Sequence, residues 1–265
     1  MAEPHITGRA LVTGAGVRLG RAMALYLAQR GFGVAVHYNS SEGPAQAVVD
    51  EIAQTGGTAV SIGADLLNEA ATQELGPRAA EALGGPLTVL VNNASIFEYD
   101  TLHTATRDSW DRHLESNLRA PFVLTQHLAQ SAPDPALDDA GEPVAQALVV
   151  NMIDQRVRKL TPEFISYTIA KMGLWAFTQT AAQALAPTVR VNAIGPGPTL
   201  RGGRQSPEHF AKQRKATILE RGANVGDITA ALGYFLDAPT VTGQLLCIDG
   251  GQHLAWETPD VLGVE

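Results

Sequence analysis

The sequence predicts an α/β protein in which a doubly wound parallel sheet forms the middle of a three-layer sandwich. Short apolar runs alternate with longer segments of helical period, and the apolar runs are continuous rather than alternating. Continuous apolar strands are typical of a parallel sheet that helices cover on both faces. The chain has 265 residues, 45% of them hydrophobic, so we expect a single domain over residues 1–265.

The predicted elements follow one another along the chain. The expected strands are 9–14, 33–38, 58–66, 86–95, 147–152, 189–195 and 244–251, and the expected helices are 21–30, 42–55, 106–131 and 163–185. The Pro- and Asp-rich stretch 131–143 is expected to be a surface loop. The segment at about 197–215 is rich in Gly and Pro and then becomes helical. It is a candidate substrate lid, because ligands in such folds bind outside the carboxyl ends of the strands.

Composition excludes several classes of function. The net charge is −8 and no run is rich in Lys or Arg, which argues against a nucleic-acid partner. No apolar stretch has the length of a membrane span, and the first residues lack the features of a signal peptide. A single cysteine excludes a disulfide framework. We expect a cytoplasmic protein with no membrane partner and no metal site.

The glycine-rich stretch TGAGVRLG (13–20) follows the first strand and opens the first helix. Gly14, Gly16 and Gly20 allow the backbone to turn tightly and to approach a pyrophosphate at the helix N-terminus. The turn also contains Val17, Arg18 and Leu19. Its position predicts a Rossmann-type dinucleotide site, although the spacing is not GxGxxG and such a turn can also be purely structural.

The end of the second strand indicates which dinucleotide binds. An NAD site usually has an acidic residue there, which holds the ribose 2′-hydroxyl. This chain instead has His37, Tyr38, Asn39, Ser40 and Ser41. Hydroxyls and the guanidinium of Arg18 favour a 2′-phosphate, so NADP(H) is predicted, while nearby Glu42 leaves NAD open. Asp65, followed by Leu66, could accept a hydrogen bond from adenine or cap a turn.

A second group of residues is suited to proton transfer. Tyr167 and Lys171 are four residues apart on one predicted helix, so they share a face. A neighbouring ammonium should lower the pKa of the tyrosine towards neutrality and make it a competent proton donor. Asn117 could hold a water on a proton relay, or could simply face another helix. Asp154 stands thirteen residues before the tyrosine.

Taken together, these motifs resemble the short-chain dehydrogenase/reductase family. The motifs are TGAGVRLG, LVNNAS (90–95), Asn117, YTIAK (167–171), VRVNAIGPGPT (189–199) and VTGQLLCIDGG (241–251). The resemblance implies a nicotinamide cofactor across the strand tips, with Tyr167 as acid and Lys171 on the ribose. It also implies that Asn117 completes the relay and that the subunits form dimers or tetramers. The residues implied along the cofactor are Asn93, Ala94, Pro196, Gly197 and Thr199.

Two positions depart from the usual pattern of the family. Arg18 replaces a glycine of TGxxxGxG, and Asp154 replaces a hydroxyl residue. Both departures resemble the pteridine reductases and the dihydromonapterin or dihydrofolate reductases of the family. The HY-x-x-S tip at 37–41 and the N-A-S-x-F stretch at 93–97 resemble the same subgroup.

Asp154 also indicates the reaction. An ionised carboxylate would oppose the negative charge that builds on oxygen when a carbonyl is reduced. A buried carboxylic acid with a raised pKa could instead deliver a proton to a pterin ring nitrogen, directly or through Tyr167. Phe97 could stack on the pterin, while Ser95 and Arg18 could bond its polar edge or the phosphates.

The predicted function is therefore NADPH-dependent reduction of a pterin C=N bond. One alternative is a carbonyl or 3-oxoacyl reductase. The other is a catalytically silent NADP-binding regulatory protein.

Overall fold

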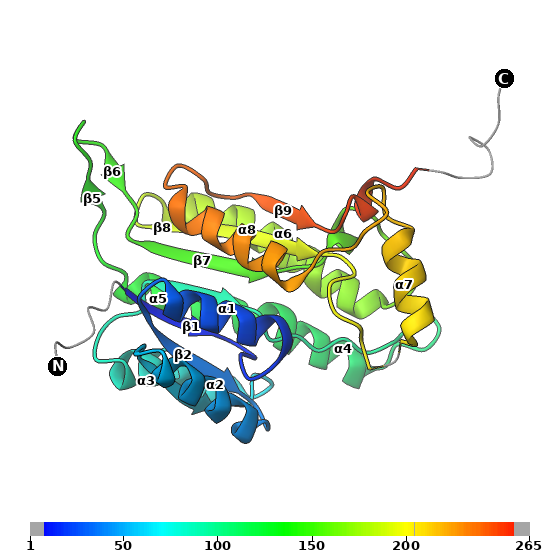
Figure 1. Cartoon of the computed structure of the whole chain (residues 1–265), viewed down its shortest axis with the longest axis horizontal. Helices are drawn as coiled ribbons and strands as arrows, with labels where there is room; N and C mark the ends of the chain where they lie inside the picture. The colour runs from blue at the N-terminus through cyan, green and yellow to red at the C-terminus, as the bar shows by residue number, and fades with distance from the viewer. Residues whose placement is uncertain (1–7, 204, 257–265) are drawn as a thin grey trace.

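A parallel seven-stranded sheet forms the centre of the computed structural model, which describes residues 8–203 and 205–256 (Figure 1). The strand order is β3-β2-β1-β4-β7-β8-β9. The strands are β1 Gly8–Val12, β2 Phe32–Tyr38, β3 Ala59–Gly63, β4 Val89–Asn92, β7 Ala147–Met152, β8 Val189–Pro196 and β9 Leu245–Ile248. All pair in parallel, which confirms the predicted Rossmann-type sheet.

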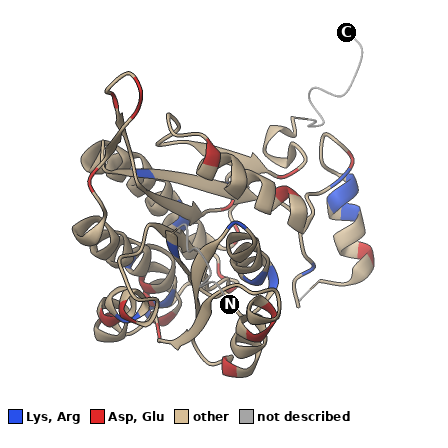
Figure 2. Ribbon diagram, turned by 60° about the vertical axis from the view of Figure 1, so that its left-hand side comes forward, with Lys and Arg blue, Asp and Glu red and all other residues tan. Residues whose placement is uncertain are grey.

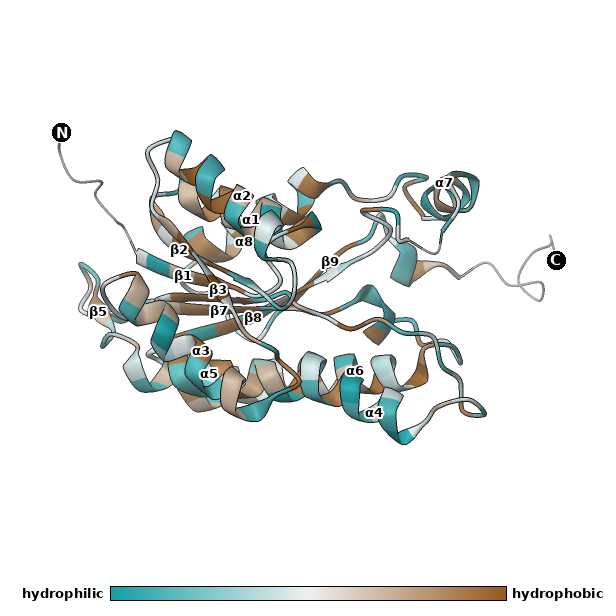
Figure 3. Cartoon of the chain, turned by 90° about the horizontal axis from the view of Figure 1, so that it is seen from below, coloured by the Kyte–Doolittle hydropathy of each residue, from teal (hydrophilic) through white to brown (hydrophobic). Residues whose placement is uncertain are grey.

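Helices cover both faces of this sheet (Figure 3). One layer contains α1 Arg18–Gln29, α2 Glu42–Gln54 and α8 Val225–Asp237, and the other contains α3 Glu69–Ala82, α5 Ala120–Ser131 and α6 Ile165–Leu185. Successive strand residues point to opposite faces, so Ala10 and Val12 join one apolar core while Leu11 joins the other. The three-layer sandwich is thereby confirmed.

The predicted helix 106–131 is divided into three parts. α4 spans Arg107–Leu114, a π-helical turn η1 spans Glu115–Arg119, and α5 follows directly. Asn117 lies in the π turn, and such turns are frequent at functional sites. The apolar pattern did not reveal the turn, because one wide turn inside a long helix changes the periodicity very little.

Other segments also differ from the predictions, which contained neither α3 nor α8. The stretch 131–143 is not only a loop, because β5 Ala136–Leu137 pairs with β6 Pro143–Val144 in an antiparallel hairpin that projects from the body in Figure 1. Strands of two residues are too short to leave a sequence pattern. α6 begins at Ile165, two residues later than predicted, because Phe164 has a left-handed backbone with φ of 56°.

Three short elements complete the described part of the chain. They are the 3₁₀ turns η2 Gln155–Val157 and η3 Gln252–Leu254, and the helix α7 Pro207–Lys215. The last turn of α7 contains the basic residues Lys212, Arg214 and Lys215, and part of the ribbon of this helix is blue in Figure 2. Within residues 8–203 and 205–256, no helix is long and apolar enough to cross a membrane, and no group of His, Cys, Asp and Glu could hold a metal ion.

Candidate active site

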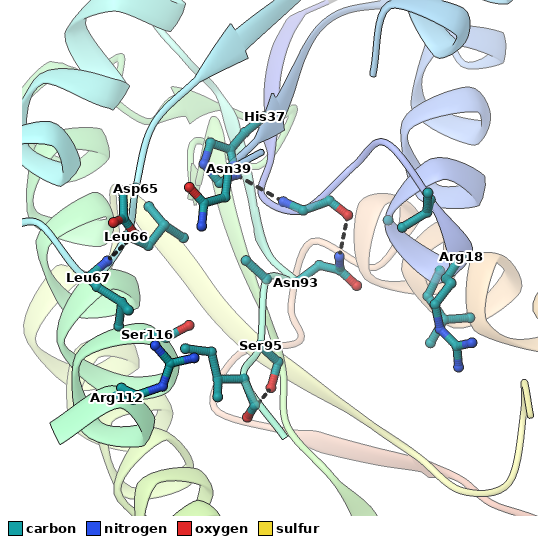
Figure 4. A pocket seen from close by; sticks show the side chains of 16 residues that line it. Arg18, His37, Asn39, Asp65, Leu66, Leu67, Asn93, Ser95, Arg112 and Ser116 are labelled. Carbon is teal, nitrogen blue, oxygen red and sulfur yellow. Dashed lines mark hydrogen bonds between the residues drawn. The ribbon is translucent and has the colours of Figure 1, made fainter. Parts of the chain in front are cut away.

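A cleft of about 490 Å³ lies where β1, β2 and β4 end (Figure 4). It brings together many of the predicted cofactor residues. Those that do not line it are Gly16, Tyr38, Ser40, Ser41, Tyr167, Lys171, Pro196, Gly197 and Thr199. Its lining comprises Gly14, Val17, Arg18, Leu19, Gly20, His37, Asn39, Asp65, Leu66, Leu67, Asn93, Ala94, Ser95, Ile96, Arg112 and Ser116.

Two side chains that directly follow the neighbouring strands β1 and β4 hold the glycine-rich turn in place. The Asn93 amide nitrogen donates to the carbonyls of Thr13 at 2.8 Å and Gly14 at 3.1 Å. The Thr13 hydroxyl accepts from the backbone N–H of Asn93 and of Ala94, both at 2.9 Å. Gly14 has a φ of 61°, which favours glycine. Asn93 therefore shapes the turn, and so does Thr13, a residue that sequence reasoning did not single out.

His37 lies beneath the cleft and forms hydrogen bonds with two separate backbone segments. It is 1% exposed, its Nδ1 accepts from the backbone N–H of Gly14 at 3.0 Å, and its Nε2 lies 3.0 Å from the carbonyl of Ala64. Because burial disfavours the charged imidazolium, the pKa of His37 is lowered to about 4. Among the predicted residues at the tip of β2, Asn39 also lines the cleft.

The N-terminus of α1 opens towards this cleft. Val17, its N-cap, makes no side-chain capping bond, and its first turn has no acidic residue. Uncapped N–H groups at the positive end of a helix dipole suit a phosphate, so these residues fit a dinucleotide. Asp65 accepts a hydrogen bond from the N–H of Leu67 at 3.0 Å, which is the turn-capping role foreseen as one of its two possibilities.

Arg18 does not point towards the tip of β2. Its guanidinium donates to the carbonyls of Arg201 at 2.9 Å and Leu200 at 3.1 Å. In Figure 4, Arg18 and Asn39 lie on opposite sides of the cleft. This placement does not support the predicted contact with a 2′-phosphate and favours a role at the reactive end of the cleft.

A second pocket of about 640 Å³ adjoins the first at Arg18. Phe97, Asp154, Pro196 and Gly197 line it, together with residues of α7 and with Leu200, Gly202, Gly203 and Gln205. The hydroxyl of buried Thr199 donates to the carbonyl of Gly197 at 3.2 Å, which fixes the turn after β8. The predicted lid segment therefore forms one wall of this pocket.

Tyr167 is hydrogen-bonded to Asp154, which lines this pocket. The phenol donates to Asp154 Oδ2 at 3.0 Å, and the N–H of Arg156 donates to Asp154 Oδ1 at 2.8 Å. Burial of the carboxyl raises the pKa of Asp154, against the opposing effect of its bond with Arg156. The two groups that the chain separates by thirteen residues thus form one proton-holding pair.

The predicted lowering of the Tyr167 pKa is wrong. Burial, and next the negative charge of Asp154, raise the pKa of Tyr167 well above its ordinary value, and the charge of Arg156 only partly opposes them. The ammonium of Lys171 donates to the carbonyl of Met152 at 2.8 Å, and burial lowers the pKa of Lys171 to about 8. Tyr167, which is 6% exposed and lines neither pocket, is therefore a neutral phenol buried behind Asp154.

Asn117 uses both ends of its side chain to hold one residue. Its Oδ1 accepts from the N–H of Ile96 at 2.9 Å, and its Nδ2 donates to the carbonyl of Ile96 at 2.8 Å. This clamp steadies the loop that carries Phe97. The Phe97 ring stacks on that of Phe164 at 4.3 Å and meets that of Tyr167 edge-on at 4.7 Å.

Sequence reasoning missed three buried polar residues next to Tyr167. Asp100, His113 and Ser166 are at most 2% exposed and are bonded to one another. No spacing could have revealed them, because Ser166 lies 53 residues from His113 and 66 from Asp100.

Comparison with known proteins identifies the family. Residues 9–209 match the family model described as short chain dehydrogenase. The structure of FolM alternative dihydrofolate reductase 1 from Brucella canis, complexed with NADP, has 41% identity and a TM-score of 0.89, covering 98% of this chain and 100% of that one. The 3-oxoacyl-[acyl-carrier-protein] reductase FabG of Staphylococcus aureus is 30% identical over 94% of this chain and 99% of its own. Hydroxynaphthalene reductase-like protein Arp2 of Metarhizium robertsii is 36% identical over 72% of this chain and 68% of its own. The chain therefore belongs to the short chain dehydrogenase family.

Proposed function

We propose that this protein uses NADPH to reduce a C=N bond of a dihydropteridine, such as dihydromonapterin or dihydrofolate. The observation that carries the proposal is the 3.0 Å bond from the Tyr167 phenol to a buried Asp154. The likeness to FolM, whose structure is complexed with NADP, supports both the nucleotide and the class of substrate.

The nucleotide would lie across the ends of β1 and β4. The uncapped N-terminus of α1 would take the pyrophosphate, and Asn39 with the neighbouring Ser40 and Ser41 would face the 2′-phosphate. Lys171 would hold the nicotinamide ribose. NADPH, when bound, supplies the hydride.

The protein must supply the proton. Reduction of a C=N bond places a hydride on carbon and a proton on nitrogen. The Tyr167–Asp154 pair holds that proton beside the pocket, and burial disfavours ionisation of both groups. Delivery through the phenol leaves the pair to recover a proton from water in the pocket.

The same pair is poorly suited to carbonyl reduction. Negative charge builds on the substrate oxygen in that reaction, and a carboxylate that accepts the Tyr167 hydrogen bond competes with the oxygen for it. A nitrogen that becomes positively charged, or is protonated, gains from a nearby carboxylate. This difference favours the C=N reaction over a 3-oxoacyl reduction like that of FabG.

The aromatic side chains favour a flat substrate. Phe97 is 43% exposed and its edge-on contact places it 4.7 Å from the Tyr167 ring. A bicyclic ring stacked on Phe97 would lie within reach of the phenol. Ser95 and Arg18, which line the adjoining cleft, would bond its polar edge.

The test is NADPH oxidation with dihydrobiopterin, dihydromonapterin and dihydrofolate, beside small ketones and a 3-oxoacyl thioester. We expect turnover of a dihydropteridine and little turnover of the carbonyl compounds. An Asp154→Ser variant, which introduces the hydroxyl usual in the family, should lose the first activity and gain some of the second.

Two results would contradict the proposal. Turnover of ketones or the thioester alone would identify a carbonyl reductase that tolerates an aspartate. Binding of NADPH without turnover of any of these compounds would indicate the regulatory protein.

A further inference from the structure

A buried carboxylate caps the catalytic helix from a distant part of the chain. Phe164, the N-cap of α6, has no side chain that can accept a hydrogen bond, and the first turn contains no acidic residue. Asp100 provides the missing hydrogen-bond acceptors. Its backbone carbonyl accepts from the N–H of Phe164 at 2.7 Å, and its Oδ1 accepts from the N–H of Ser166 at 3.3 Å. A negative charge at this end of a helix is also favoured by the helix dipole.

The same carboxylate begins a chain of side-chain hydrogen bonds. Asp100 Oδ2 accepts from the hydroxyl of Ser166, and Ser166 Oγ lies 2.7 Å from Nδ1 of His113. On the far side of the imidazole, Nε2 accepts from the N–H of Glu98 at 3.1 Å. Asp100 is 2% exposed, and Ser166 and His113 are fully buried.

The groups at the two ends of this series of hydrogen bonds determine which atom donates in each of them. The N–H of Glu98 can only donate, so Nε2 of His113 carries no proton and Nδ1 carries one. Nδ1–H then donates to Ser166, whose own proton goes to the Asp100 carboxylate. Burial lowers the pKa of His113, which keeps the imidazole neutral as this arrangement requires.

These hydrogen bonds connect the three segments that surround the Tyr167 phenol. Asp100 belongs to the loop that carries Phe97, His113 belongs to α4, and Ser166 directly precedes Tyr167. The imidazole of His113 also meets the Tyr167 ring edge-on at 6.0 Å. A shift of Ser166 would therefore move the phenol relative to both Asp154 and Phe97.

We propose that Asp100, Ser166 and His113 are positioning residues that hold the Tyr167 phenol between Asp154 and the Phe97 ring. None of the three lines either pocket, so we expect them to act through Tyr167. The proposal concerns the geometry of the proton donor, so it holds for whichever substrate the protein reduces.

Asp100→Asn is the sharpest test. In one orientation its NH₂ group faces the Ser166 hydroxyl, and in the other it faces the Ser166 N–H. The hydroxyl cannot reverse to accommodate it, because His113 would then need its proton on Nε2, opposite the N–H of Glu98.

We expect Asp100→Asn to lower kcat by at least about tenfold and to leave the KM for NADPH unchanged, because small errors in the placement of a reacting group are costly. Ser166→Ala should behave alike, and the double variant should be no worse than the more impaired single variant, since the residues act as a unit. Ser109→Ala is the matched control: Ser109 donates to the same Oδ2 at 3.2 Å from α4, and its loss should leave kcat near the wild-type value.

A spectroscopic measurement tests the direction of the hydrogen bonds, and the choice of temperature separates positioning from simple loss of folding. Nitrogen-15 NMR of the wild-type protein should show His113 as the Nδ1–H tautomer, and kinetics should be measured well below each variant's melting temperature. If Asp100→Asn does not fold, Ser166→Ala carries the test, because it leaves the backbone bonds to Asp100 intact. An Nε2–H tautomer, a kcat within twofold of wild type in Ser166→Ala, or an equal loss in Ser109→Ala would overturn the proposal.

Discussion

Arg18 has a backbone conformation that favours glycine. The effect of its backbone on stability can therefore be separated from the effect of its side chain on function. Its φ of 55° lies in the left-handed region, which costs an L-residue about 1–2 kcal/mol. Glycine adopts this conformation without strain, so Arg18→Gly should relieve it. Arg18→Ala removes the same guanidinium but keeps the strain, and is therefore the matched control.

The expected difference follows from two opposing terms. Relief of the left-handed conformation favours the glycine variant by about 1.5 kcal/mol, while the greater freedom of glycine in the unfolded chain offsets about 0.4–1 kcal/mol of this. The glycine variant should therefore be more stable than the alanine variant by roughly 0.5–1 kcal/mol. For a chain of this size that corresponds to about 2 °C in the melting temperature.

Thermal and urea unfolding of the two variants measure this difference, and steady-state kinetics measure the function of the side chain. Both variants lose the hydrogen bonds to Leu200 and Arg201, so both should show raised KM values for NADPH and for NADH. Since the guanidinium points away from Asn39, NADPH and NADH should be affected by similar factors. An alanine variant as stable as the glycine variant would refute the strain argument, and a selective loss for NADPH would restore the 2′-phosphate interpretation.

Three further predictions concern the buried groups. Tyr167→Phe should lower kcat by about 10²-fold or more without weakening NADPH binding, as measured by turnover and by fluorescence titration; a near-normal kcat would exclude the phenol as the proton donor. Asp154→Asn should lower the rate of dihydropteridine reduction by about 10²-fold. It should also lower the pKa of Tyr167, because the carboxylate contributes to raising that pKa. Absorbance titration of the phenol measures this pKa, and an unchanged value would contradict the assigned role of the carboxylate. The pKa of His37 is lowered to about 4, so the unfolded state binds more protons between about pH 4 and 6.5 and the protein loses stability as the pH falls through that window. The loss should be about 2 kcal/mol at pH 5 in urea unfolding, and a His37→Asn variant that shows the same loss would rule His37 out as its source.

The sequence by itself determined the succession of the sheet strands along the chain, most of the helices between them and the residues at the strand ends, but not the helices α3 and α8. Continuous apolar runs such as 147–152 can only be buried on both faces, and this is why they predicted the parallel sheet. Glycines at 14, 16 and 20, and the tyrosine and lysine on one helix face, likewise act through local geometry that spacing encodes. The two-residue strands β5 and β6 and the π turn around Asn117 escaped prediction because they are too short to alter a periodic pattern.

Only the tertiary structure decided the electrostatics of the site. The spacing of Tyr167 and Lys171 indicated a lowered tyrosine pKa, but the enclosure of the phenol and its bond to Asp154 reverse that direction. In the same way, the guanidinium of Arg18 reaches Leu200 and Arg201, residues more than 180 positions away. Burial and hydrogen-bond direction depend on atoms that the fold brings together from distant segments, so no local pattern in the sequence contains them.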